Sequence, residues 1–128
     1  MIQVAAAIIE NELGQLLIAR RKKGKSQAGL WEFPGGKIEE GESGEDCLRR
    51  ELKEEMNIEI EPYAYVGVND HWYGELHIRL FAWRARYAAG TIILADHDEY
   101  RWAEKKELES FEFAEADRMF VQLILRDG

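Results

Sequence analysis

The chain has 128 residues, 46% of them hydrophobic and 33% charged, with a formal net charge of −8, so we expect residues 1–128 to form one globular domain. The negative charge argues against a protein that binds a nucleic acid polymer or an acidic membrane surface. A single cysteine excludes an internal disulfide and suits the cytoplasm, and no apolar run approaches the roughly 18 residues of a membrane span.

The first predicted elements form a hairpin. Ile2–Ile9 is an uninterrupted, β-branched apolar run, which indicates a buried strand, and it lacks the basic start of a signal peptide. Asn11–Gly14 supplies a turn, and Gln15–Ala19 is the returning strand. The basic run Arg20–Lys25 follows, and it is either a solvated loop or a surface that meets a polyphosphate.

An aromatic segment leads into a glycine-rich loop. Trp31 and Phe33 alternate around Glu32, as in a short extended segment, and Pro34-Gly35 is a turn signal. The two aromatic side chains either pack in the core or form a wall for a nucleobase, since base stacking contributes about 1–3 kcal/mol.

An acidic helix comes next and begins at Ser43, whose spacing to Asp46 is a capping-box pattern. At 3.6 residues per turn, one face of this helix is apolar and is predicted to pack in the core: Leu48, Leu52 and Met56. An adjoining face gathers three acids: Glu51, Glu54 and Glu55. Arg50 offsets part of their repulsion. The face is either solvated or neutralised by a hard divalent cation with oxygen ligands.

The second half of the chain is predicted to contain mostly strands. Ile58–Val68 alternates as a strand, Asn69–Gly74 is a turn, Glu75–Tyr87 is a long central strand, and Gly90–Leu94 is a short strand. His71–Tyr73 are either residues of the hairpin tip or part of a specificity wall.

The C-terminal part begins with an acidic loop, Ala95–Trp102, that leads into another strand. Lys105–Ser110 reads as a short turn or helix. Ala114–Leu125 is predicted to be an amphipathic closing helix. Its inward side chains are Met119, Phe120, Leu123 and Ile124.

The loop and acidic helix together give the frame G-x5-E-x7-R-E-L-x-E-E-x-N-I, from Gly36 to Ile58. This frame resembles the signature of the Nudix hydrolases, G-x5-E-x7-R-E-U-x-E-E-x-G-U with U aliphatic. The one departure is Asn57, where the family has a glycine that ends the helix in a left-handed conformation, for which Asn is the next-best residue. The resemblance implies the α/β (α+β) Nudix fold, a mixed β-sheet sandwiched between helices.

The resemblance also implies a hydrolase that depends on Mg²⁺ or Mn²⁺. Glu54 and Glu55, with the Gly35 carbonyl, are the metal ligands implied. Glu51 is a further ligand, or it orients or deprotonates water, and Arg50 orients Glu51 or Glu54. The general base stays open, because these roles vary within the family.

The run Leu30–Gly36, L-W-E-F-P-G-G, is similar to the MutT-type subgroup that acts on nucleoside triphosphates. The similarity implies substrate contacts at Arg21, Glu32, Phe33, Gly35 and Gly36. MutT relatives also carry an acidic residue six positions before a strand tryptophan, where it assists the metal or the water. Asp96 holds that place here, and its neighbour His97 is a further candidate.

The segment Phe113–Asp117 resembles CTP-pyrophosphohydrolase-like relatives, in which it opens the last helix near the base pocket. Glu115 and Asp117 are therefore candidate base contacts. The alternative for Asp117 is a charge that interacts with the helix dipole.

The expected reaction converts a nucleoside triphosphate and water to a nucleoside monophosphate and pyrophosphate. The substrates are (modified) CTP or dCTP, or oxidised purine triphosphates such as 8-oxo-dGTP, as in nucleotide-pool sanitation and DNA repair. The alternatives are a catalytically silent nucleotide sensor, a structural calcium-binding domain, and a hydrolase of ADP-ribose or of a non-nucleotide diphosphate. Small members of the family are monomers or dimers, so a homodimer is one alternative for the assembly.

Overall fold

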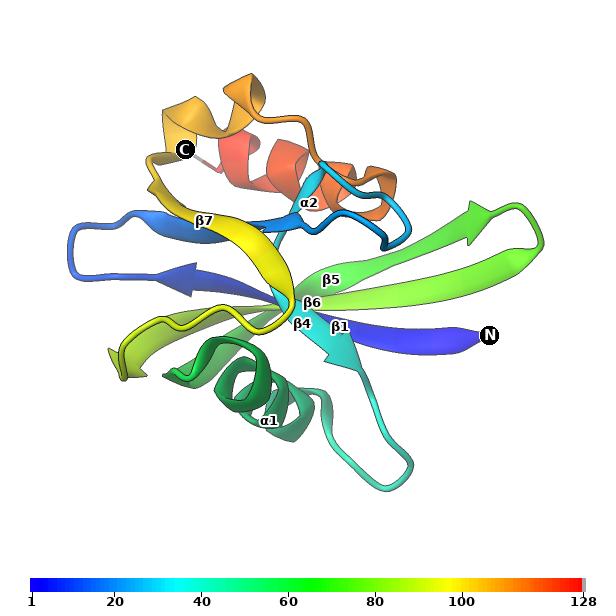
Figure 1. The fold of residues 1–128 in the computed structure, drawn as a ribbon, viewed down its shortest axis with the longest axis horizontal. Helices are drawn as coiled ribbons and strands as arrows, with labels where there is room; N and C mark the ends of the chain where they lie inside the picture. The colour runs from blue at the N-terminus through cyan, green and yellow to red at the C-terminus, as the bar shows by residue number, and fades with distance from the viewer. Residues whose placement is uncertain (128) are drawn as a thin grey trace.

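The computed structural model describes residues 1–127. Its elements in chain order are β1 (Ile2–Glu10), β2 (Leu16–Arg21), β3 (Trp31–Glu32), β4 (Gly35–Lys37), α1 (Gly44–Met56), β5 (Glu59–Tyr73), β6 (Leu76–Ala89), β7 (His97–Ala103), the 3-10 helix η1 (Lys105–Ser110) and α2 (Glu115–Arg126). A mixed sheet lies between α1 on one side and α2 on the other (Figure 1), which confirms the predicted fold class. No helix within these residues is long and apolar enough to cross a membrane.

Strand β1 is the centre of the sheet. It runs parallel to β6 along its whole length and pairs antiparallel with the short strand β4. On the side of β1 away from β6 lies β2, which also pairs with β3 and β7. Strand β5 pairs with β6 and forms the other edge of the strand order. Strand β1 thus holds the glycine strand β4 in the middle of the molecule, next to α1.

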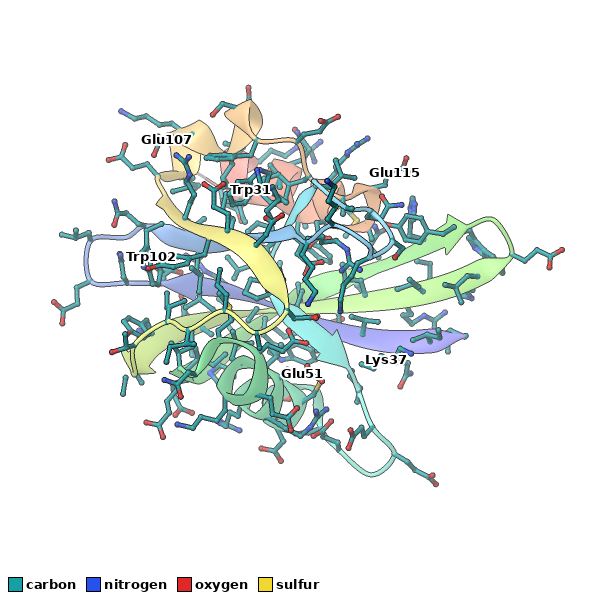
Figure 2. All side chains as sticks on the ribbon, viewed as in Figure 1. Trp31, Lys37, Glu51, Trp102, Glu107 and Glu115 are labelled. Atoms are coloured by element: carbon teal, nitrogen blue, oxygen red, sulfur yellow. The ribbon has the colours of Figure 1, made fainter. Side chains whose placement is uncertain are left out.

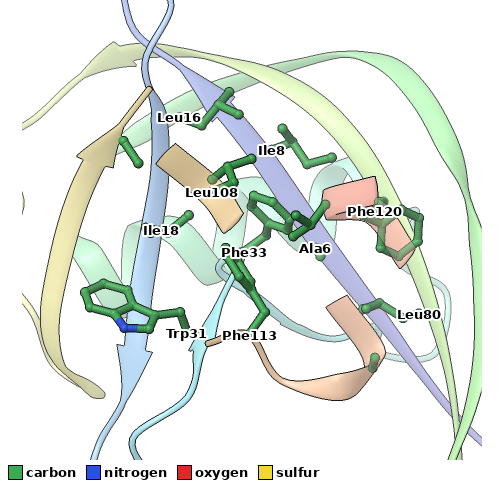
Figure 3. Packing of buried hydrophobic residues seen from close by; sticks show 14 residues of the cluster. Ala6, Ile8, Leu16, Ile18, Trp31, Phe33, Leu80, Leu108, Phe113 and Phe120 are labelled. Atoms are coloured by element: carbon green, nitrogen blue, oxygen red, sulfur yellow. The ribbon is translucent and has the colours of Figure 1, made fainter. Parts of the chain in front are cut away.

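The buried side chains form two core clusters, one on each face of β1. The cluster on the α1 side includes Ala5, Ala7, Ile9, Leu48, Leu52 and Met56. The cluster on the α2 side, seen in Figure 3, includes Ala6, Ile8, Phe33, Phe113 and Phe120. Because both faces of β1 are covered, its apolar run needs no polar alternation, as predicted.

Both ends of α1 follow the local sequence rules. The hydroxyl of Ser43 accepts a hydrogen bond from the Asp46 N–H at 3.1 Å. Asn57 adopts the left-handed conformation with φ of 60°, and its N–H bonds back to carbonyls of the last helical turn. These contacts confirm the predicted start and the role of asparagine at the end of the helix.

The predicted turn at Asn69–Gly74 is wrong. Strand β5 continues to Tyr73, and only Gly74 and Glu75 form the turn into β6. Cross-strand contacts extend the hairpin: the Trp72 ring stacks on His77 at 4.3 Å between centroids, and the Arg79 guanidinium donates to Asp70 at 2.8 Å. Such pairs stabilise a sheet whatever the turn propensity of the residues that make them.

The predicted short strand at Gly90–Leu94 is also wrong. The segment lies along the end of α1, where the N–H of Ile93 donates to the Met56 carbonyl and the N–H of Ala95 to the Glu55 carbonyl, both at 3.0 Å. These carbonyls at the helix C-terminus have no partner within the helix. The segment satisfies them and so does not join the sheet. The predicted closing helix and the short helix before it are confirmed as α2 and η1.

Leu52→Ala should lower the free energy of unfolding by about 2–5 kcal/mol, because it removes a side chain that is only 1% exposed and leaves a cavity. Urea denaturation measures this loss. Lys53→Ala, at the adjacent exposed position, is the matched control and should change stability little. Equal midpoints for the two variants would contradict the inward packing of α1.

Candidate active site

A cavity of about 640 Å³ opens between β1, β4, α1, the loop after β2 and the start of α2. Nine predicted site residues line it: Arg21, Glu32, Phe33, Gly35, Gly36, Glu51, Glu55, Asp96 and Asp117. Three other predicted site residues do not: Arg50, Glu54 and Glu115. The fold therefore brings most of the candidates to one place from five separate parts of the chain.

The acidic end of the cavity depends on the glycines of β4. A Cβ atom on Gly35 would lie 1.9 Å from the carbonyl oxygen of Ala5 on β1. A Cβ atom on Gly36 would lie 2.3 Å from the carboxyl carbon of Glu51. Only glycine permits this approach, so β4 can press against β1 while the Glu51 carboxylate lies directly over its backbone. Figure 2 shows Glu51 where α1 meets β4.

Arg50 fixes the position of Glu51 from outside the cavity. Its guanidinium donates to Glu51 Oε1 at 2.9 Å, to Glu54 Oε2 at 3.4 Å and to the Lys37 carbonyl at 3.2 Å. It also binds both oxygens of Glu42, at 2.8 and 3.0 Å. These hydrogen bonds from Arg50, together with a backbone one from Glu39, lower the pKa of Glu42 to about 2. Sequence analysis gave Glu42 no role, although it occupies the first glutamate position of the signature.

The carboxylates at this end repel one another. Burial, and then the charge of Glu51 and a hydrogen bond to it, raise the pKa of Glu55 to about 8, with smaller contributions from Asp96 and Glu32. A divalent cation would relieve this repulsion, and oxygen donors are what a hard cation prefers. The donor set therefore fits such an ion.

The three signature glutamates are not equally placed. Glu51 and Glu55 line the cavity, whereas the side chain of Glu54 is 61% exposed and contacts Arg50. Among residues 1–127, no group of three or more His, Cys, Asp or Glu side chains is already arranged around a metal position.

Asp117 lines the cavity from α2, which lies on the opposite side of the sheet from α1 (Figure 1), and we call this part the opposite end of the cavity. It lies in the first turn of α2, is 6% exposed, and accepts a hydrogen bond from the Phe33 N–H at 3.1 Å. Burial, followed by the charge of Glu32, raises the pKa of Asp117 well above its usual value. Asp117 is therefore a buried cavity group as well as a residue at a helix N-terminus.

The two aromatic residues that flank Glu32 have different surroundings. Trp31 is buried in the core against Phe111 and does not line the cavity. Phe33 is also buried, packing on Phe113 at 5.3 Å between centroids, and it lines the cavity. Core packing therefore accounts for Trp31, while Phe33 belongs to both the core and the cavity wall.

Contacts with Arg21 and His97 hold the Glu32 carboxylate in place. Its Oε1 accepts from Arg21 Nη1 at 2.9 Å, and its Oε2 lies 2.8 Å from His97 Nε2. His97 is buried, and its Nδ1 has no hydrogen-bond partner in the described part of the chain, so we assign the proton to Nε2. The sequence showed only a histidine next to Asp96. His97 is the first residue of β7 and pairs with Arg21 of β2, a contact between distant parts of the chain.

The β5–β6 hairpin contributes four residues to the wall: Tyr73, Leu76, Ile78 and Leu80. Tyr73 lines the cavity, and its hydroxyl accepts from the Ala116 N–H at 3.3 Å. Trp72 is 58% exposed on the outside of the hairpin. Glu115 is also largely exposed, and its carboxylate lies 3.0 Å from His71 Nε2. Tyr73 thus belongs to the wall, whereas Trp72 and His71 do not line it.

Comparison with known proteins identifies the family of this chain. A family model described as NUDIX domain matches residues 1–124. The chain belongs to the Nudix family. The CTP pyrophosphohydrolase of Escherichia coli is 40% identical over 91% of this chain and 86% of that protein. An 8-oxo-dGTP diphosphatase of Haemophilus influenzae is 32% identical over 99% of this chain and 93% of that protein.

Solved structures show the same relationship. A MutT protein from Methanosarcina mazei superposes with a TM-score of 0.87 at 28% identity, over 98% of this chain and 94% of that one. The chain is thus a Nudix hydrolase, of a family that generally uses divalent metal ions. In this Nudix hydrolase the signature helix supplies the acidic end of the cavity, and α2 supplies the opposite end.

Asp117→Asn should remove a pH dependence of stability. Because the fold raises the pKa of Asp117 above the unfolded value of about 3.9, this group stabilises the fold fully only below that value. The contribution is lost as the pH rises through the raised pKa. Asparagine can accept the Phe33 N–H but cannot ionise. The variant should therefore gain stability relative to wild type as the pH rises from about 5 to about 9, measured by urea denaturation.

Glu115→Gln is the matched control, because Glu115 lies in the same helical turn with its side chain 54% exposed. Its stability should follow the wild-type pH dependence. A constant difference between Asp117→Asn and wild type across the pH range would contradict the burial of an ionisable carboxyl at this position.

Proposed function

We propose that this Nudix hydrolase converts nucleoside triphosphates to nucleoside monophosphates and pyrophosphate with Mg²⁺ or Mn²⁺. The observation that carries the proposal is one cavity with paired carboxylates at one end and a buried carboxyl group at the other. A nucleotide has the complementary layout, with a charged polyphosphate joined to a base that offers hydrogen-bonding groups. The cavity volume lies within the range of about 300–1,000 Å³ that is usual for small-molecule sites.

The acidic end would hold the metal. Glu51, Glu55 and the Gly35 carbonyl are the proposed ligands, and Glu54, one position along the helix, is a further one. When bound, a divalent ion neutralises phosphate charge and lowers the pKa of a water molecule. Arg50 keeps the Glu51 carboxylate in place through its 2.9 Å hydrogen bond. Either Glu51 or Asp96 would orient the attacking water.

The opposite end would hold the base. A protonated Asp117 carboxyl can donate one hydrogen bond and accept others, which suits the edge of a nucleobase. Phe33, Tyr73, Arg21 and Glu32 also line the cavity. Gly36 would let the phosphates approach the backbone, while Glu115 is proposed as a contact at the rim.

The substrate class follows the relatives. One relative is named for CTP and others for 8-oxo-dGTP, so we propose (modified) CTP or dCTP, or oxidised purine triphosphates, in nucleotide-pool sanitation. A homodimer is one alternative for the assembly and a monomer is the other, and light scattering would distinguish them.

A screen of natural, oxidised and methylated nucleoside triphosphates, with and without Mg²⁺, tests the proposal. The expected products are monophosphate and pyrophosphate, formed only when the metal is present. Release of inorganic phosphate and a diphosphate would contradict the proposed bond cleavage. Binding of a triphosphate without any turnover would favour a silent sensor, and cleavage of ADP-ribose alone would favour the other substrate class.

Glu55→Gln should keep the fold and lower turnover by at least about 10- to 100-fold. Losses of about this size are typical even when a residue that only hydrogen-bonds to a metal ligand is replaced. The substitution keeps the volume of the side chain but removes the charge that would bind the ion. Glu59→Gln, at an exposed position just beyond the same helix, is the control and should retain activity. Wild-type turnover in Glu55→Gln, with pyrophosphate release as the readout, would refute the role of this residue as a ligand.

A further inference from the structure

We propose that Lys25, with Lys22 beside it, is an internal counter-ion of Asp96 that leaves this carboxylate when the metal binds and then pairs with the substrate phosphates. Lys25 would thus be a positioning residue for Asp96 and a binding residue for the polyphosphate. The phosphate part rests on the proposed function, and the metal part does not require a substrate.

The ion pair lies at the cavity. The Lys25 ammonium contacts Asp96 Oδ2, and the Lys22 ammonium is 3.8 Å from Asp96 Oδ1. Lys25 and Asp96 both line the cavity, together with Glu51 and Glu55. Any cation that binds between these carboxylates therefore meets the charge of Lys25 at short range.

Among the described residues, no cavity-lining cation other than Lys25 pairs with Asp96. Arg21 donates to Glu32 and to the Ser26 carbonyl, and Arg50 is held by Glu42 outside the cavity. Lys37 also lines the cavity, but it is on β4 and no ion pair links it to Asp96 among residues 1–127. Lys25 is thus the cavity-lining cation that neutralises Asp96.

The side chain can change partner while the backbone stays in place. The loop from residue 22 to residue 30 is closed by its own hydrogen bonds, from the Gly29 N–H to the Arg21 carbonyl at 2.9 Å and from Arg21 Nε to the Ser26 carbonyl at 2.7 Å. Lys25 reaches Asp96 on a flexible four-carbon chain, and its side chain is 38% exposed. An ion pair of this exposure is weak enough to exchange.

The charge balance gives a direction to the exchange. A divalent cation attracts Asp96 more strongly than an ammonium does, so metal binding displaces Lys25. A triphosphate brings several negative charges to the same cavity, and the released ammonium is then free to pair with them. Lys25 should therefore oppose binding of the metal alone and favour binding of the metal–triphosphate complex.

Lys25→Gln tests this pair of opposite effects. The affinity of the nucleotide-free protein for Mn²⁺, measured by electron paramagnetic resonance of the free ion, should rise by about 3- to 10-fold, because the competing positive charge of Lys25 is removed. The affinity for the α,β-methylene analogue of CTP in excess Mg²⁺, measured by calorimetry, should fall by about 5-fold or more, because the ammonium that would bind the phosphates is removed.

Lys23→Gln is the matched control, because it removes the same charge from the same loop at a residue that does not line the cavity. Lys25→Arg should keep both affinities near wild type. The proposal is overturned if Lys25→Gln equals Lys23→Gln in the Mn²⁺ measurement, or if both ligands change affinity in the same direction. If the wild-type protein cleaves no triphosphate, the proposed function fails, and the Mn²⁺ measurement alone then decides the metal part.

Discussion

The site depends on the close approach of the β1 backbone and of the Glu51 side chain to the two glycines of β4. Gly35 presses against the Ala5 carbonyl of β1, and Gly36 leaves room for the Glu51 carboxyl above it. A side chain at Gly35 would push β4 away from β1, and one at Gly36 would displace the Glu51 carboxyl group of α1. The glycine signature is therefore a packing requirement first, and the position of the carboxylates follows from it.

Negative charge in excess is the second organising feature. The cavity gathers carboxylates from β3, α1, α2 and the residue before β7. Burial, and then repulsion from neighbouring carboxylates, raise the pKa of Glu55 and of Asp117. Each nearby cation neutralises one or two carboxylates: Arg50 pairs with Glu42 and Glu51, Arg21 with Glu32, and Lys25 with Asp96. Carboxylates gathered in this way repel one another, and a bound divalent cation would offset that repulsion.

Sequence reasoning succeeded where local rules decide the structure. The start of α1, its apolar face and its left-handed end at Asn57 depend on neighbours within a few residues, and all three were predicted correctly. It failed where distant contacts decide, as at Asn69–Gly74, where cross-strand pairs extend the hairpin, and at Gly90–Leu94, where helix carbonyls take the N–H groups. The burial of Asp117 and His97 could not be predicted either, since it depends on elements far apart in the chain.

The segment between β6 and β7 is more than a connection. It is bonded through Ile93 and Ala95 to the last carbonyls of α1, including that of Glu55, and Asp96 follows directly. These hydrogen bonds fix the position of Asp96 relative to Glu55, two acids that are far apart in the sequence. Ordinary surface loops tolerate insertions, but a residue added between Ala95 and Asp96 would move the Asp96 carboxylate away from its present position next to the end of α1.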